Sequence, residues 1–142
     1  MKQLGKYSIG VGDRFTRQGK AQLRAIMRAN EKGLDICPVW NKSNREHTYV
    51  GTVPSDTRKE ADEAVKALGY EGVYFVDADH INLNTVSSYV ETSDFFTLDV
   101  ASFIGKGSSR EEVDAFIASC KKYLGEMVIP GMDKPLQVTV EL

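Results

Sequence analysis

The run Val73-Tyr74-Phe75-Val76-Asp77-Ala78-Asp79-His80 changes from apolar to charged at its midpoint. Its first half is aromatic and β-branched, as in a buried strand. Its second half supplies the carboxylates of Asp77 and Asp79 and the imidazole of His80. Ligands of α/β proteins bind beyond the carboxyl ends of parallel strands, so this run predicts a strand that leads into a polar site. These oxygen and nitrogen donors are of the kind that a divalent metal takes.

Strands and helices alternate along the rest of the chain. Apolar runs rich in β-branched and aromatic residues predict strands, and apolar stripes at the 3.6-residue period predict helices. We expect strands at residues 7–12, 35–40, 73–80 and 95–100, and helices at residues 19–32, 55–68, 85–91 and 110–124. The last helix is expected to bury one apolar face, made of Val113, Phe116, Ile117, Cys120 and Leu124. Residues 136–142 indicate a strand or the first turn of a helix.

This alternation predicts an α/β fold with a parallel sheet and right-handed crossovers. Two architectures fit the pattern. One is a partial TIM-like barrel of about four βα units, since a full barrel needs about 250 residues. The other is a small doubly wound sheet. The length of 142 residues suits one domain, and no repeat or linker marks a second, so we expect a single α/β domain over residues 1–142.

The amino-acid composition limits the classes of protein to which this chain can belong. Hydrophobic residues make up 42% of the chain and charged residues 27%, as in a soluble globular protein. The formal net charge of -2 gives no reason to expect a nucleic acid or an anionic membrane as a partner. No apolar run approaches the ~20 residues that span a bilayer. The two cysteines, Cys37 and Cys120, lie in no metal or redox spacing and are expected to be reduced thiols of a cytoplasmic protein.

Pro38 lies inside the second expected strand. Because proline lacks a backbone N–H, this strand is expected at an edge, bulged or only partly paired. The polar run at residues 41–47 is then expected to be a loop, either a plain surface excursion or a functional lid. Its amides, cations, carboxylate and imidazole could grip a polyhydroxylated anion.

Polar residues follow all four expected strands. They are Asp13 and Arg14 after the first strand, Asn41 and Lys42 after the second, Asp77, Asp79 and His80 at the third, and Asp99 at the fourth. The carboxyl ends of parallel strands share one edge, so we expect these side chains to form a site there. From the residues alone, His80 could be a metal ligand, a general base or a turn residue bonded to the backbone. His47 is the only other histidine, so the chain offers at most two imidazoles to a metal.

Four motifs occur in order along the chain: GVGDRF at residues 10–15, QGKAQL at 18–23, PVWNKSNREH at 38–47 and FVDADHI at 75–81. Together they resemble the tagaturonate/fructuronate epimerase family, from about residue 7 to residue 135. The resemblance implies a barrel fold, activity on hexuronates of pectin breakdown, and a divalent metal held largely by histidines, with His80 as one ligand. It also implies a protein about three times this length. This chain then resembles an internal or N-terminal portion, with further metal ligands and a catalytic acid beyond Leu142.

The chemistry of that reaction constrains the mechanism. The two ketohexuronates differ at a carbinol carbon β to the ketone, whose C–H is not acidified directly. The hypothesis is therefore retro-aldol cleavage, rotation of the aldehyde and re-addition, with the metal holding the ketone and enediolate oxygens. A carboxylate of Asp13, Asp77 or Asp79 would move the hydroxyl proton, and Lys42 or Arg45 would bind the substrate carboxylate. The residues expected to bind the sugar acid are Arg14, Asn41, Lys42, Asn44, Arg45, His47 and Asp99.

Two alternatives stay open. The chain could be part of another metal-assisted sugar isomerase or aldolase. It could also be a non-catalytic half-barrel that forms a homodimer through exposed strand edges. Uptake of a divalent ion separates the catalytic alternatives from the last one, and assays of hexuronate ketoses against phosphosugars separate the first two.

Overall fold

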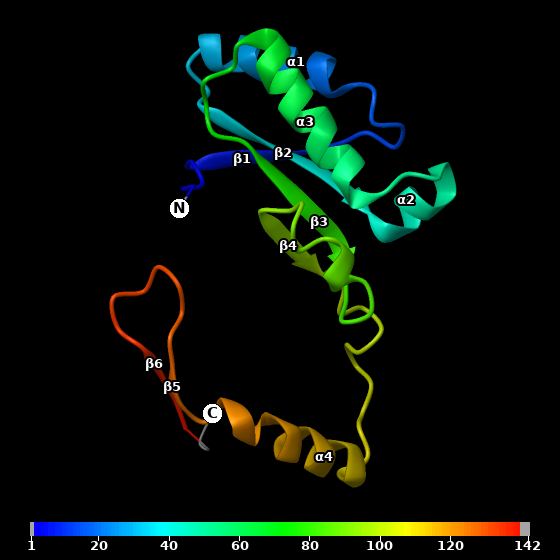
Figure 1. Cartoon of the computed structure of the whole chain (residues 1–142), viewed down its shortest axis with the longest axis vertical. Coiled ribbons are helices and arrows are strands. Elements are labelled where there is room, and N and C mark those ends of the chain that lie inside the picture. The colour runs from blue at the N-terminus through cyan, green and yellow to red at the C-terminus, as the bar shows by residue number, and fades with distance from the viewer. Residues whose placement is uncertain (1, 140–142) are drawn as a thin grey trace. The chain divides into compact units, whose positions relative to one another are not determined.

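The computed structural model describes residues 2–139 and is shown in Figure 1. The described chain forms two compact units, which divide between Ala101 and Ser102. The single domain expected over residues 1–142 stays a prediction, and each unit is described by itself.

The first unit is built on a four-stranded parallel sheet. Its strands are β1 (Tyr7–Gly12), β2 (Ile36–Ser43), β3 (Phe75–Ile81) and β4 (Phe95–Leu98). They lie side by side in the order β1-β2-β3-β4, and every neighbouring pair is parallel. This confirms the α/β class and the parallel sheet. Strands β1 and β4 are the two edges, and pairing of an edge with a second copy stays a prediction.

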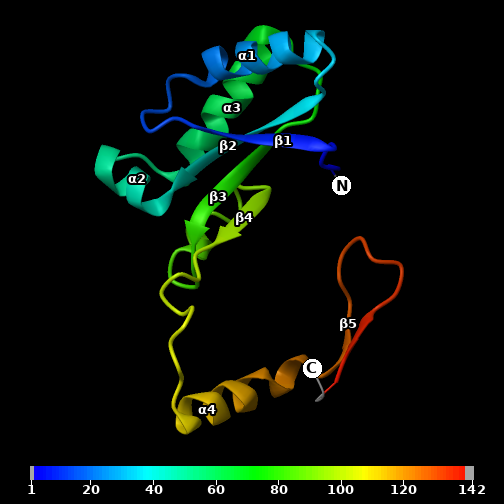
Figure 2. The same cartoon turned by 180° about the vertical axis from the view of Figure 1, so that it is seen from behind.

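Two helices cover one face of this sheet, α1 (Gly19–Glu31) and α3 (Pro54–Leu68). The views from both sides place them on the same side of the strands (Figures 1 and 2). The core between helices and sheet is a cluster of fully buried side chains: Leu23, Trp40, Ala61, Ala64 and Val76. Sequential strand order with helices on one face is the arrangement of consecutive βα units, whereas a doubly wound sheet has helices on both faces.

Local signals explain where α3 begins and ends. Pro54 occupies its first turn, where a missing N–H costs nothing. Asp56, in the first turn, accepts a hydrogen bond at 2.8 Å from the N–H of Val53, the residue that precedes the helix. The helix ends at Leu68, and Gly69 follows it with a φ of 60°, the left-handed conformation that glycine adopts most readily.

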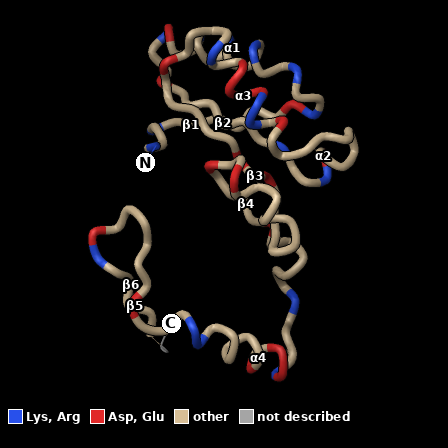
Figure 3. The backbone as a smooth tube through the Cα atoms, viewed as in Figure 1, with Lys and Arg blue, Asp and Glu red and all other residues tan. Residues whose placement is uncertain are grey.

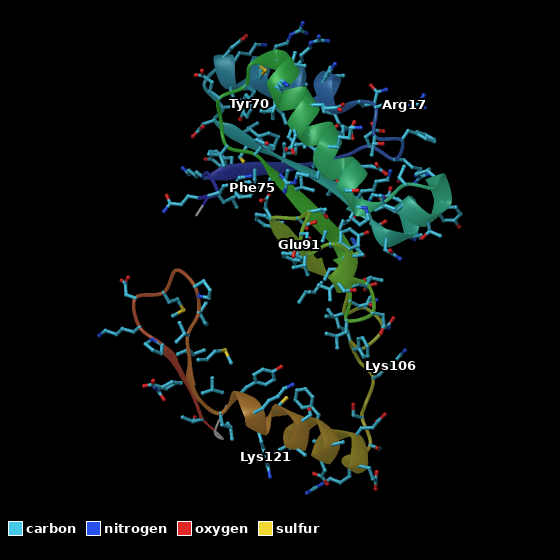
Figure 4. All side chains as sticks on the ribbon, viewed as in Figure 1. Arg17, Tyr70, Phe75, Glu91, Lys106 and Lys121 are labelled. Carbon is cyan, nitrogen blue, oxygen red and sulfur yellow. The ribbon has the colours of Figure 1, made fainter. Side chains whose placement is uncertain are left out.

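The opposite face of the sheet carries the alternate residues of each strand. Cys37, Val39 and Phe75 form a second buried cluster there. Phe75, labelled on β3 in Figure 4, meets Phe95 of β4 edge to face, with ring centroids 5.5 Å apart. The Cys37 thiol is buried and free, as expected.

The expected loop at residues 41–47 is wrong. Strand β2 continues to Ser43, and helix α2 (Asn44–Val50) follows at once. The cause is a capping box: the Ser43 hydroxyl accepts from the Glu46 N–H at 3.3 Å, and a Glu46 oxygen accepts from the Ser43 N–H at 3.1 Å. Two orphan N–H groups are thereby satisfied, so a polar run begins a helix.

Pro38 lies within β2, which is a central strand. It pairs with Ile9 of β1, but the pairing of β2 with β3 starts only at Val39. The strand is therefore only partly paired at the proline, which is one of the three arrangements expected from the sequence. The helix expected at residues 85–91 is one 3-10 turn, η1 (Val86–Ser88).

The second unit contains α4 (Arg110–Cys120), a 3-10 turn η2 (Lys121–Tyr123), and an antiparallel pair of strands, β5 (Gly125–Met127) and β6 (Leu136–Val138). Ser109 caps α4 through a capping box with Glu112. Figure 4 labels Lys121 at the start of η2. The segment expected at residues 136–142 is a strand up to Val138, and residues 140–142 lie outside the described residues.

The expectation that α4 buries an apolar face is not met in the described residues. Val113, Ile117 and Phe116 are 41%, 51% and 68% exposed. An amphipathic helix buries its stripe only against another element, and no described element of this unit packs on that stripe. Among the described residues, no helix is long and apolar enough to cross a membrane.

Candidate functional site

A polar hollow of about 390 Å³ lies at the carboxyl ends of β2, β3 and β4. It is lined by Ser43, Arg45, Glu46, Asp79, His80 and Asp99. Ser43 ends β2, Arg45 and Glu46 belong to the first turn of α2, Asp79 and His80 end β3, and Asp99 follows β4. The sheet therefore brings together four of the residues predicted for the site, which are Arg45, Asp79, His80 and Asp99.

An irregularity in β3 aims His80 into this hollow. The pairing of β3 with β4 shifts register between Ala78 and Ile81, and His80 has a φ of 54°. Strict alternation would place Asp79 and His80 on opposite faces, but bulges re-aim side chains and cluster next to active sites. A histidine whose backbone is in the left-handed conformation lowers the stability of the fold by about 1 to 3 kcal/mol, which contacts elsewhere in the fold must offset.

Asp79 and His80 form a close pair. Asp79 Oδ1 lies 2.6 Å from His80 Nδ1. The imidazole is largely exposed to solvent, whereas the Asp79 side chain is 21% exposed. A carboxylate bonded to one ring nitrogen orients the ring and leaves the other nitrogen free to bind a ligand or a proton.

Glu46, on α2, also lines the hollow. Its carboxylate holds Ser43 through the capping box and lies 3.7 Å from the Arg14 guanidinium. Burial acts to raise the pKa of Glu46, but the hydrogen bonds from Ser43 and the nearby cations outweigh it and hold the pKa below its ordinary value. Glu46 is therefore a fixed negative charge at neutral pH.

The charges of the hollow are mixed. Its lining carries three carboxylates, the Arg45 guanidinium and the His80 imidazole. Both signs are also spread along the backbone of the first unit (Figure 3). A ligand with one carboxylate and several hydroxyl groups matches this set, because the guanidinium binds a carboxylate and carboxylates accept from hydroxyls.

Lys42 and His47 lie outside the hollow and are 1% and 3% exposed. Lys42 shares the face of Trp40, toward the helices, since strand residues alternate. Its ammonium donates to the Arg14 carbonyl and, at 2.9 Å, to Thr52 Oγ1. Burial lowers the pKa of Lys42 against the pull of nearby carboxylates. The predicted contact of these two residues with a substrate stays a prediction.

Asp13 is engaged in its own loop. Its carboxylate accepts from the N–H groups of Phe15 at 3.0 Å, of Arg17, and of Gln18 at 2.5 Å. Burial raises the pKa of Asp13, but these hydrogen bonds outweigh it and lower the pKa overall. Arg14 is exposed and reaches the site only through its ion pair with Glu46.

Asp77 and Asn41 do not line the hollow and are neighbours in register on the face opposite α1 and α3. Asp77 is 8% exposed and accepts from Thr97 Oγ1 at 2.8 Å. Burial raises its pKa. The Asn41 amide packs over β1, where a Cβ on Gly12 would lie 2.9 Å from Asn41 Oδ1. Asn44 starts α2 and is exposed, and it does not line the hollow.

The sequence reasoning missed Ser43 and Glu46 as site residues. The signal was present, because Ser43-Asn44-Arg45-Glu46 has the S-x-x-E spacing of a capping box. Recognising it would have placed a helix start, and thus two fixed polar groups, at the end of β2.

The described residues do not complete a metal site. Within residues 2–139, no group of three or more His, Cys, Asp or Glu side chains is placed so as to hold a metal ion. Asp79 and His80 supply one adjacent pair of donors, fewer than the three or four protein ligands of a zinc site.

Comparisons with known proteins agree on one family. A family model described as UxaE, tagaturonate epimerase, matches residues 1–130. The chain is similar to the crystal structure of fructuronate-tagaturonate epimerase UxaE from Cohnella laeviribosi with two glycerols. The TM-score is 0.64 and the sequence identity is 19%, and the similarity covers 98% of this chain and 31% of that one. The native crystal structure of the same enzyme gives a TM-score of 0.61 at 19% identity, covering 94% of this chain and 29% of that one. The chain thus spans under a third of the length of these structures. No curated protein sequence matches it.

Proposed function

Because the chain belongs to the tagaturonate epimerase family, we propose that its hollow is part of the hexuronate site of an epimerase that interconverts D-tagaturonate and D-fructuronate. One observation carries the proposal: a family match over residues 1–130 coincides with a polar hollow at the carboxyl edge of the sheet. That edge is where α/β folds bind small molecules.

The lining residues suit a sugar acid. Arg45 supplies the guanidinium for the carboxylate of the sugar, and Asp79 and Asp99 accept from its hydroxyl groups. The Arg45 side chain extends from a helix whose start is fixed by Ser43 and Glu46, so the cation is held on a rigid element.

We assign the proton transfer to Asp79. Of the three carboxylates predicted to be catalytic, it is the one that lines the hollow. Its bond to His80 at 2.6 Å holds it in place. In the proposed reaction, the carboxylate takes the proton of the hydroxyl on the inverting carbon. The bond from that carbon to its neighbour next to the ketone then breaks, leaving an aldehyde and an enediolate whose charge rests on the former ketone oxygen.

Epimerisation follows from rotation of the aldehyde. The enediolate re-forms the same bond to the other face of the aldehyde, and Asp79 returns its proton to the new alkoxide. No atom is gained or lost. The route needs no removal of the unactivated C–H hydrogen, which is why we prefer it to direct deprotonation.

A divalent metal is a further part of the proposal. When bound, such an ion supplies Lewis-acid stabilisation of the ketone and enediolate oxygens. His80, oriented by Asp79, is the ligand that the first unit would offer. The remaining ligands would come from outside residues 2–139, in keeping with the partial coverage of the solved structures. By the same reasoning, the four parallel strands of the first unit would form part of a barrel.

Substitution of Asp79 tests the assignment. We expect Asp79→Asn to lower kcat for the interconversion by at least about 100-fold, the usual contribution of a general acid or base. Asp114→Asn, on the exposed helix α4, is the matched control and should leave kcat unchanged. Asp79→Asn with the full kcat of an active parent enzyme would remove Asp79 from the mechanism. Turnover in D2O tests the route separately, because deuterium at the inverted carbon of the product would exclude retro-aldol cleavage.

A further inference from the structure

Two of the buried polar atoms that lack a partner among the described residues belong to rings that lie close together. They are Nε2 of His47, on α2, and Oη of Tyr89, in the turn that follows η1. The two side chains are 3% and 1% exposed, and their ring centroids lie 6.0 Å apart at an interplanar angle of 57°. A buried polar group that lacks a partner loses the free energy of its former bond to water, so such groups nearly always find one.

The hydrogen bonds around His47 favour the tautomer with the proton on Nε2. The Lys42 ammonium, which is a donor only, donates to Thr52 Oγ1. The hydroxyl hydrogen of Thr52 is then free to donate to His47 Nδ1, 2.9 Å away. Since Nδ1 accepts, the proton of the neutral ring lies on Nε2. Burial and the charge of Lys42 lower the pKa of His47 to about 4, which keeps the ring neutral at physiological pH.

Tyr89 offers the complementary group. Burial and the charges of Asp79 and Glu46 raise its pKa to about 12, so the hydroxyl stays protonated and can both donate and accept. An oxygen atom within hydrogen-bond distance of both groups would accept from His47 Nε2–H and bond to Tyr89 Oη. The accessible surface of both atoms is close to zero, so the ligand must be small enough to be enclosed on folding.

We propose that His47 Nε2 and Tyr89 Oη bind one buried water molecule between them. This water would complete a hydrogen-bond network that runs from the Arg14 carbonyl through Lys42, Thr52 and His47 to Tyr89. The network links the segments that follow β1, β2 and β3. The water would then join α2, the helix that carries Glu46, to the turn that contains Tyr89. Buried waters of this kind are integral parts of protein structures.

Nuclear magnetic resonance of the 142-residue chain tests the site directly. The chain has two histidines, so a His80→Asn variant assigns the ring signals. We expect His47 to be the Nε2–H tautomer and its Nε2 proton to show a rotating-frame Overhauser contact with a long-lived water. That contact should vanish in Tyr89→Phe. A proton on Nδ1, or a protected Nε2 proton without a water contact, would overturn the proposal.

A double-mutant cycle gives a second readout. His47→Asn keeps an acceptor for the Thr52 hydroxyl but removes Nε2, and Tyr89→Phe removes Oη. We expect a coupling of at least about threefold in the unfolding equilibrium constant. Tyr74→Phe is the matched control, because its hydroxyl bonds to Asp62 at the surface, and it should not couple to His47→Asn. If Tyr89→Phe raises stability and adds independently to His47→Asn, the two atoms share no water. If His47→Asn does not fold, Tyr89→Phe alone decides. Loss of stability together with loss of the Overhauser contact supports the shared water, and a gain in stability contradicts it.

Discussion

Replacing Glu60 by glutamine should stabilise the first unit at pH 8. Glu60 projects from α3, and its Oε1 accepts from the Gly19 N–H at the start of α1, at 2.7 Å. Burial, followed by the hydrogen bond and charge of Asp13, raises the pKa of Glu60 from 4.5 to about 7. The neutral carboxyl therefore accepts from Gly19 and donates to Asp13. Glutamine offers the same acceptor and the same kind of donor without a proton to lose.

The sign and size follow from linkage. Since the folded-state pKa is raised, the folded state binds the proton more tightly than the unfolded chain does. The resulting stabilisation is fully present below pH 4.5 and is lost as the pH rises through about 7. A pKa difference of this size corresponds to about 3 kcal/mol. Because the side chain is half-buried, solvent screening reduces it to about 1 to 2 kcal/mol.

Urea unfolding at pH 4 and pH 8 measures this effect. The stability of Glu60→Gln minus that of the parent chain should grow by about 1 to 2 kcal/mol between the two pH values. Glu63→Gln, on the exposed side of the same helix, is the control and should stay within about 0.5 kcal/mol at both. A difference that does not change with pH, or a Glu60→Gln variant that is less stable at pH 8, would refute the account of this carboxyl.

Three other substitutions probe the core, the capping box and the hollow. Leu23→Ala empties a fully buried position between α1 and the sheet and should cost about 2 to 5 kcal/mol in chemical unfolding, whereas a loss under 1 kcal/mol would mean that the core is not packed as described. Ser43→Ala removes the cap of α2 and should lower the free energy of unfolding by about 0.5 to 2 kcal/mol. Thr48→Ala, on the same helix, is the control, and equal losses in the two variants would mean that the capping box does not stabilise α2. Arg45→Gln should weaken the binding of D-tagaturonate, measured by calorimetric titration, by about 10-fold or more without changing the melting temperature. Unchanged affinity there would remove Arg45 from the proposed site.

The sheet and the two large helices could be predicted because their signals are local. Leu23 and Ile26 in α1 follow the helical period, and Phe75 and Val76 open an apolar strand. The continuation of β2 to Ser43 could not be predicted from the sequence, because Asn41, Lys42 and Ser43 are polar and such a run is typical of a loop. Lys42 is buried because alternation points it toward the helices and Thr52 and the Arg14 carbonyl receive its ammonium.

The site could be predicted only in part. A shared edge of parallel strands brings Asp79, His80 and Asp99 together, as expected. Asp13 follows the edge strand β1 but is bound by the N–H groups of its own loop, which no strand pattern reveals. His80 joins Asp79 only because β3 departs from regular pairing, and such a bulge depends on the neighbouring strand and not on the local sequence.

A crystal structure of the protein with D-tagaturonate bound would test the central claim most directly. The account predicts the sugar acid in the hollow at the ends of β2, β3 and β4, with its carboxylate on Arg45 and a hydroxyl within hydrogen-bond distance of Asp79. A sugar bound elsewhere, with Arg45 and Asp79 both free of contact to it, would contradict the account.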